Sequence, residues 1–217
     1  VGTPRVSFRE TLRRPVRVEG ECTKRIGMSG LFGKVTVEFE PQKGEQAVTV
    51  VNNIPLETLP PELAAAAEQG LRGALLSGEL GFPVINLRAT LTGGQMDQEM
   101  SNEIAFQAAG ADAVHRALKD NMVLLEPRMK VEVTVPDDYL GPVTGDLNAR
   151  RAEITQIHAR GKVRTIEALI ALSRMFDYSD KVHSLAQGRA SWTMEPRDYT
   201  PVPDEVLRAM LGGEVLF

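Results

Sequence analysis

Apolar and polar positions alternate in two segments near the N-terminus. Apolar or small residues occupy every second position of both segments: Val16, Val18, Gly20 and Cys22, then Val35, Val37 and Phe39. A period of two is typical of half-buried strands. The stretch between them, residues 24–34, has glycines at spacing three and three basic residues, Lys24, Arg25 and Lys34. We therefore expect a flexible cationic loop at the end of a two-stranded ribbon.

This glycine-rich stretch does not fit the known phosphate-binding loops. A Walker loop requires G-x-x-x-x-G-K-[ST], but Val35 follows Gly33 and Lys34, and Met28 stands five residues before Gly33. The dinucleotide fingerprint fails because the glycine spacing differs and a strand follows where a helix should begin. Nucleotide binding at this loop is therefore disfavoured, and a mobile hairpin end is the simplest alternative.

The remaining pattern up to residue 122 predicts an α+β domain. A third strand is expected at 47–51, a helix from Pro60 to Gly78, and a further strand at 85–92. A second polar loop follows at 93–100, and Ser101 is expected to cap the next helix. The predicted order is βββαβα.

The second part of the chain has a different order. Alternation predicts a strand at 129–135, strands at about 152–159 and 162–172, and a last strand around Trp192, with short helices at 139–147 and 175–185. This βαββαβ order is the ferredoxin-like plan. We expect a final helix, 203–217, to return to the first domain. The predicted fold is thus α+β with two domains, 1–122 joined by 203–217, and 123–202.

Composition limits the class of protein. The chain has 217 residues, 42% hydrophobic and 25% charged, with net charge −4, which is typical of a globular protein. The lone cysteine, Cys22, excludes an internal disulfide and fits a reducing compartment, so we expect a cytoplasmic protein without membrane contact. Residues 1–34 contain eight Lys or Arg against three Glu, a local basic surface on an acidic chain.

No residue pattern indicates a catalytic or metal site. The three histidines, His115, His158 and His183, lack the spacing of metal ligands. Asp137 and Asp138 fit the first turn of a helix better than a catalytic pair. We therefore predict no catalytic residue, no metal and no cofactor in this chain.

Several stretches resemble bacterial elongation factor G. Those similar to the fourth domain of that family are Val1-Gly2, Pro4, Val6, Phe8-Arg9-Glu10 and Asn102-Glu103-Ile104-Ala105-Phe106. Those similar to its fifth domain are Leu124-Leu125-Glu126-Pro127-x-Met129, Gly145-Asp146-Leu147-Asn148-x-Arg150-Arg151, Gly188-Arg189-Ala190 and Tyr199-x-Pro201-Val202-Pro203. The resemblance covers essentially the whole chain, in order.

The resemblance implies a left-handed βαβ crossover in the first domain, which is normally disfavoured. It implies a ribosome-bound monomer whose two loops lie side by side and meet transfer RNA and messenger RNA in the decoding site. The loop residues that would contact RNA are Lys24, Arg25, Gly27, Ser29, Gly30, Gly33, Lys34, Gln95, Asp97 and Gln98. The second domain would contact the sarcin–ricin loop of large-subunit rRNA, near the GTPase centre, through Asn148, Arg150 and Arg151. GTP and Mg²⁺ would belong to a nucleotide-binding domain that this sequence lacks, so we expect no GTP hydrolysis by this chain alone.

Both loops depart from the family pattern. The first usually reads close to Ser-Gly-Gly-Arg-Gly-Gln-Tyr/Phe-Gly, whereas here it reads Ile26-Gly27-Met28-Ser29-Gly30-Leu31-Phe32-Gly33. In the second loop Asp97 stands where the family commonly has histidine. Three alternatives to a translocation factor remain open: a diverged paralogue acting in ribosome recycling, protection or regulation, a scaffold whose loops bind protein, and an independent enzyme using a ferredoxin-like pocket.

Overall fold

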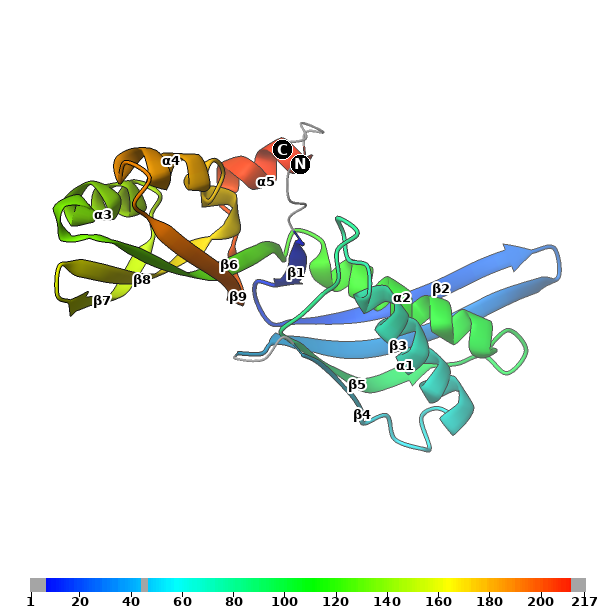
Figure 1. Ribbon diagram of the computed structural model, residues 1–217. Coiled ribbons are helices and arrows are strands. Elements are labelled where there is room, and N and C mark those ends of the chain that lie inside the picture. Colours follow the sequence, from blue (N-terminus) through cyan, green and yellow to red (C-terminus); the bar gives the residue numbers. More distant parts are fainter. Residues whose placement is uncertain (1–6, 44–46, 212–217) are drawn as a thin grey trace. The chain divides into compact units, whose positions relative to one another are not determined.

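The computed structural model describes residues 7–43 and 47–211 (Figure 1). It divides into two compact units, Arg9–Leu124 and Leu125–Phe217, the second also including the described residues before Arg9. This division lies two residues from the boundary expected at 122. The motif residues Val1-Gly2, Pro4 and Val6 lie outside the described part of the chain.

The first unit is a four-stranded sheet with two helices on one face. Its elements are β1 (Arg9–Leu12), β2 (Val16–Ile26), β3 (Ser29–Pro41), β4 (Val48–Asn52), α1 (Pro61–Leu75), β5 (Leu87–Gln95) and α2 (Glu103–Leu118). The sheet order is β2-β3-β5-β4, with β4 parallel to β5 and the other pairs antiparallel, and the short β1 does not belong to this sheet. A βαβ crossover through α1 therefore joins two neighbouring strands, as expected; its left hand remains a prediction.

Alternation along β3 explains which face the helices cover. Val35, Val37 and Phe39 are buried, whereas Glu38 and Glu40 point outward and are exposed. The helices contribute mainly alanine and leucine to this core. Small side chains allow α1 and α2 to pack closely on the sheet and on each other.

The second unit confirms the predicted βαββαβ order. Its elements are β6 (Met122–Pro136), α3 (Leu140–Ala149), β7 (Glu153–Arg160), β8 (Val163–Ala171), α4 (Tyr178–Leu185), β9 (Ser191–Pro201) and α5 (Asp204–Leu211), with 3-10 turns at Asp137–Tyr139 and Leu172–Arg174. The strands run antiparallel in the order β9-β6-β8-β7. This is the arrangement of a ferredoxin-like fold, with a separate core between sheet and helices.

Three expectations differ from the structure. Residues 24–34 do not form a loop, because β2 and β3 remain paired up to Ile26 and Ser29. The second loop is shorter than expected, since β5 continues to Gln95. The last helix, α5, is grouped with the second unit rather than with the first, and the end of the expected helix, 212–217, lies outside the described residues.

Candidate nucleic-acid interface

The first candidate loop is the end of a long two-stranded ribbon, formed by β2 and β3. Arg25 pairs with Gly30 and Ile26 with Ser29, so only Gly27 and Met28 form the turn. Gly27 has φ +63°, the left-handed conformation that such tight hairpin turns require and that glycine adopts readily. Figure 1 shows the ribbon projecting beyond α1 and α2. We call residues 24–31 the ribbon tip.

The second candidate loop braces this ribbon. The Phe32 backbone N–H donates to the Met100 carbonyl oxygen at 2.9 Å, and the Ser101 hydroxyl donates to the Phe32 carbonyl oxygen at 2.7 Å. Residues 95–101, which we call the bracing segment, therefore lie beside β3, as the resemblance implies. Asn102 caps α2 instead of Ser101, because its side-chain oxygen accepts from the Ala105 backbone N–H at 2.9 Å.

Asp97 organises the bracing segment internally. Its carboxylate accepts hydrogen bonds from the backbone N–H groups of Glu99 at 2.9 Å and Met100 at 3.0 Å. Its own backbone N–H donates to the Ser101 hydroxyl oxygen at 2.9 Å. An aspartate that bonds the backbone two residues ahead forms an Asx turn. One carboxylate oxygen is thus committed to the loop itself, which explains an acidic residue at this position.

Two of the candidate glycines have packing roles. Gly33 is buried, and a Cβ atom there would lie 3.0 Å from the Ala105 carbonyl oxygen of α2. A Cβ atom on Gly30 would lie 2.5 Å from the Lys24 carbonyl oxygen and 3.3 Å from the Met100 sulfur. Both glycines therefore allow backbone segments to approach closely, and Gly33 is not accessible to a ligand.

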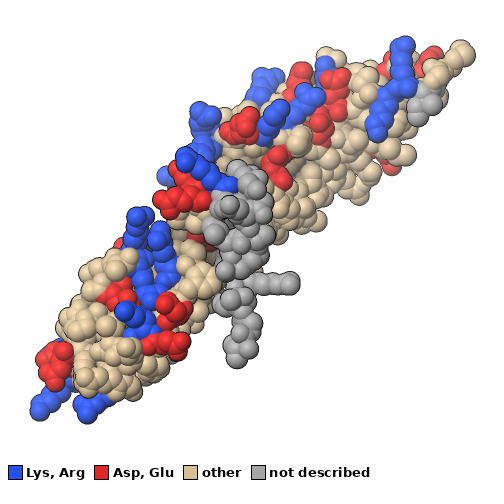
Figure 2. All heavy atoms as spheres, turned by 90° about the horizontal axis from the view of Figure 1, so that it is seen from above, with Lys and Arg blue, Asp and Glu red and all other residues tan. Residues whose placement is uncertain are grey.

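The basic residues of the ribbon differ in their surroundings. Lys24 and Arg25 are exposed, and within the described residues neither side chain has an ion-pair partner. The Lys34 side chain is only 25% exposed and its ammonium lies 3.8 Å from a Glu19 carboxylate oxygen. In Figure 2, both Lys or Arg and Asp or Glu side chains lie behind the uncharged end of the ribbon. The remaining candidates differ in burial: Ser29, Gln95 and Gln98 are exposed, and Asp97 is partly buried.

The sequence analysis did not select Met28, although its side chain is 107% exposed. Methionine is normally buried, so an apolar residue in a two-residue turn is unusual. Its position directly after Gly27, between two alternating segments, was a signal that could have identified it. A long apolar side chain at the very end of the ribbon is part of this surface.

In the second unit, Arg150 is enclosed by its own fold. Its guanidinium donates to Asp146 at 3.0 Å, to the carbonyl oxygens of Arg174 and Phe176 at 2.8 and 2.9 Å, and to Asp177 at 3.2 Å. It also lies 5.0 Å from the Tyr178 ring centroid, and its side chain is only 14% exposed. Arg150 therefore holds the segment before α4 against α3, and its charge is already neutralised.

Its neighbours in the motif are accessible. Arg151 follows α3 with φ +58°, and both Arg151 and Asn148 are exposed. A left-handed residue directly after a helix turns the chain sharply, which directs the two adjacent arginines to different surroundings. A second basic turn, which the sequence analysis did not select, connects β7 and β8, where Arg160 and Lys162 are exposed.

Ion pairing and burial shift some pKa values in this unit. Arg128 donates two hydrogen bonds to Asp198, at 2.7 and 2.6 Å, and this contact lowers the pKa of the Asp198 carboxyl. Burial raises the pKa of the Tyr178 phenol, so that it remains neutral. Tyr178 packs edge-on against Trp192, with ring centroids 5.2 Å apart. These groups stabilise the fold and do not form an acid–base pair.

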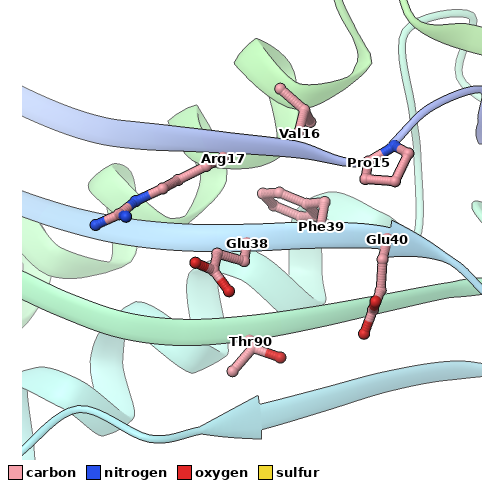
Figure 3. Close-up of a pocket in the computed structure, with 7 residues that line it drawn as sticks. All are labelled: Pro15, Val16, Arg17, Glu38, Phe39, Glu40 and Thr90. Carbon is pink, nitrogen blue, oxygen red and sulfur yellow. The ribbon is translucent and has the colours of Figure 1, made fainter.

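A hollow on the open sheet face of the first unit does not resemble an active site. This pocket of about 280 Å³ is lined by Pro15, Val16, Arg17, Glu38, Phe39, Glu40 and Thr90 (Figure 3). Glu38 and Glu40 point to the same side, but the Glu40 carboxylate lies 3.6 Å from Arg88, and no histidine, cysteine or serine is present. Within the described residues, no three His, Cys, Asp or Glu side chains are grouped as metal ligands, and no helix could span a membrane.

Comparisons with known proteins cover nearly the whole chain. The family model of elongation factor G domain IV matches residues 4–121, and that of the elongation factor G C-terminus matches residues 123–210. Elongation factor G of Fervidobacterium nodosum is 41% identical over 215 residues, which are 98% of this chain and 31% of that protein. A protein of Thermus thermophilus, solved by crystallography, superposes with a TM-score of 0.83 at 27% identity, covering 98% of this chain and 32% of that chain.

The chain thus spans about a third of the length of these relatives. The domain IV model matches the part of the chain that forms most of the first unit. The C-terminus model matches the part that forms most of the second unit. The chain therefore belongs to the elongation factor G family, of which it represents domain IV and the C-terminal domain.

Proposed function

We propose that this chain is the ribosome-engaging C-terminal part of a translation elongation factor. Its ribbon tip and bracing segment would enter the decoding site and act on transfer RNA and messenger RNA during translocation. One observation carries this proposal: Lys24 and Arg25 lie exposed, without ion-pair partners in the described residues, on a ribbon that projects beyond the helices.

Electrostatics supports RNA as the partner of the ribbon tip. RNA phosphates attract lysine and arginine over long distances, and each neutralised phosphate releases counterions. From Cys22 to Val37 the chain has no acidic residue, so the tip itself carries only positive charge. The ordered contacts from Ser101 and Met100 to Phe32 hold the tip in one position, which reduces the entropy lost on binding.

For the second unit we propose contact with large-subunit rRNA near the GTPase centre. Asn148 and Arg151 are the accessible members of the candidate set, while Arg150 ties the end of α3, which carries them, to the segment before α4. GTP and Mg²⁺ would bind in other domains of the complete protein. In this proposal, the residues described here position RNA and take no part in hydrolysis.

Binding of the 217-residue chain to purified ribosomes across a salt series tests the proposal. The variant is Lys24→Ala/Arg25→Ala, and Lys43→Ala/Lys119→Ala is a control with the same loss of charge at other exposed sites. We expect the tip variant to bind more weakly, with a salt slope reduced by about 1 for each lost phosphate contact. A salt slope equal to that of the control would remove the ribbon tip from the RNA interface.

A diverged factor with another role on the ribosome is a second candidate. Asp97 favours it, because its carboxylate stabilises the bracing segment and would repel a nearby phosphate. Translocation and ribosome-splitting assays with the complete protein distinguish the two. Splitting without translocation would favour the second candidate.

A further inference from the structure

Met28 is the most exposed large hydrophobic residue among the described side chains, at 107%. It occupies the second position of the two-residue turn, where no strand or helix covers it. Burying an apolar side chain of this size is favourable. Met28 therefore leaves apolar surface at a projecting end, which a partner of matching chemistry would bury.

The residues around Met28 indicate what kind of partner covers it. Lys24 pairs with Leu31 and Arg25 with Gly30, two adjacent positions of one strand. Side chains of adjacent strand residues point to opposite faces, so the two cations flank the turn on both faces of the ribbon. The apolar contact thus lies between two positive charges.

The bracing segment supports this arrangement from behind. The Met100 sulfur lies 3.3 Å from the position of a Cβ atom on Gly30, so it backs the tip directly. The acidic groups of this segment are Asp97 and Glu99. Asp97 is bonded to its own backbone, and Glu99 is exposed. Neither belongs to the ribbon tip, whose own charges are positive.

A nucleotide presents the complementary chemistry. It has an apolar base face for the thioether, and phosphates on both sides for the cations. Methionine is flexible and polarizable, makes favourable sulfur–aromatic contacts, and serves as an apolar wedge against bases in other nucleic-acid complexes. A protein partner would need acidic residues on both sides of an apolar pocket, whereas every RNA strand carries phosphates on both sides of its bases.

We propose that Met28 is a nucleobase contact, which gives the ribbon tip a preference for RNA with an unpaired, accessible base over an uninterrupted duplex. This inference rests on the proposed function, since it assumes that the tip meets RNA. It adds a residue and a class of RNA target to that function. Lys24 and Arg25 supply affinity for any strand, and Met28 supplies the preference.

Two RNA hairpins of the same sequence test this proposal. One carries a single bulged nucleotide, and the other carries an abasic residue at the same place, so both have the same phosphates. Binding of the 217-residue chain is measured by fluorescence anisotropy for wild type, Met28→Gln and Met28→Leu. Because the turn is exposed, circular dichroism should be unchanged in both variants.

We expect wild type to bind the base-bearing hairpin about three- to tenfold more tightly than the abasic one, which lies within the range of a single sulfur–aromatic contact. Met28→Gln should lose this preference, while Met28→Leu, which keeps the apolar contact but lacks the sulfur, should keep part of it. The Lys24→Ala/Arg25→Ala variant should weaken binding to both hairpins equally and leave the preference intact.

The outcomes separate the two proposals. If Lys24→Ala/Arg25→Ala weakens RNA binding but Met28→Gln behaves as wild type on both hairpins, the nucleobase contact is refuted and the proposed function stands. If no variant changes RNA binding, both fail. If Met28→Gln weakens binding to purified ribosomes but not to either hairpin, the partner of Met28 is protein and the nucleobase contact is likewise refuted.

Discussion

Two glycines of α1, three residues apart, should respond in opposite ways to the same substitution. A Cβ atom on Gly70 would lie 1.9 Å from the Gln107 carbonyl oxygen of α2, and Gly110 makes the reciprocal approach to Ala67 at 2.1 Å. A Cβ atom on Gly73 would meet nothing within 4 Å. Gly70→Ala therefore tests the close helix crossing, and Gly73→Ala is its matched control.

The expected magnitudes follow from these distances. Replacing glycine by alanine in a helix interior is worth about 1 kcal/mol of helix propensity. At Gly73 nothing opposes this gain, so the free energy of unfolding should rise by about 0.5–1 kcal/mol. At Gly70 the helices must separate by about 1 Å to reach an acceptable contact, and overpacking typically costs about 1–3 kcal/mol or more. Because the clash is with backbone, we expect a net loss of about 2 kcal/mol.

Urea denaturation with two probes measures both effects. The far-ultraviolet circular dichroism signal is dominated by α1 and α2, with 15 and 16 residues. The single tryptophan, Trp192, lies in β9 and reports on the second unit. Gly70→Ala should lower the circular dichroism midpoint and leave the tryptophan transition unchanged. Equal stability of the two variants would refute the close-crossing argument.

Two further predictions concern enclosed charges. Arg150→Ala should lower the unfolding free energy of the second unit by about 3 kcal/mol, because it leaves the mostly buried Asp146 carboxylate without its ion-pair partner. Arg151→Ala, at an exposed site, should change it by less than about 0.5 kcal/mol. Trp192 fluorescence measures both, and equal effects would contradict the enclosed position of Arg150. Burial raises the pKa of the Glu10 carboxyl, whose oxygen accepts from the backbone N–H groups of Leu80 and Phe82. Stability from this group is fully present below the unfolded pKa, about 4.3, and is lost as pH rises through the folded pKa. The unfolding free energy of wild type relative to Glu10→Gln should therefore fall as pH rises above about 4, and a difference that stays constant or rises would disprove it.

The ribbon shows which structural features sequence periodicity can predict and which it cannot. Alternation correctly placed both strands, but the glycines between them predicted a loop where the structure has paired strands. Glycine marks either a turn or a close approach, and the sequence does not say which. Gly27 is the turn. Gly30 instead admits the Lys24 carbonyl of the paired strand and the Met100 sulfur, and Gly33 admits the backbone of Ala105, 72 positions away. Only the fold brings those residues together.

The adjacent arginines Arg150 and Arg151 show the same limit for the candidate site. They have the same side chain, and the motif selects both. The left-handed turn at Arg151 leaves Arg150 among the groups around α4 and Arg151 in solvent. The ferredoxin-like order was predictable because its strands alternate regularly. The grouping of α5 was not, because its amphipathic pattern fits more than one surface.

The two-residue turn at Gly27 and Met28 limits how this part of the protein can change over evolution or by engineering. A single inserted residue in either strand would shift the register by one and turn every following side chain to the opposite face. If the insertion is in β3, Phe32 would no longer meet Ser101. Insertions that add one residue to each strand preserve the pairing and lengthen the ribbon by about 3.4 Å per pair. Relatives of this chain should therefore vary here by substitution or by paired length changes.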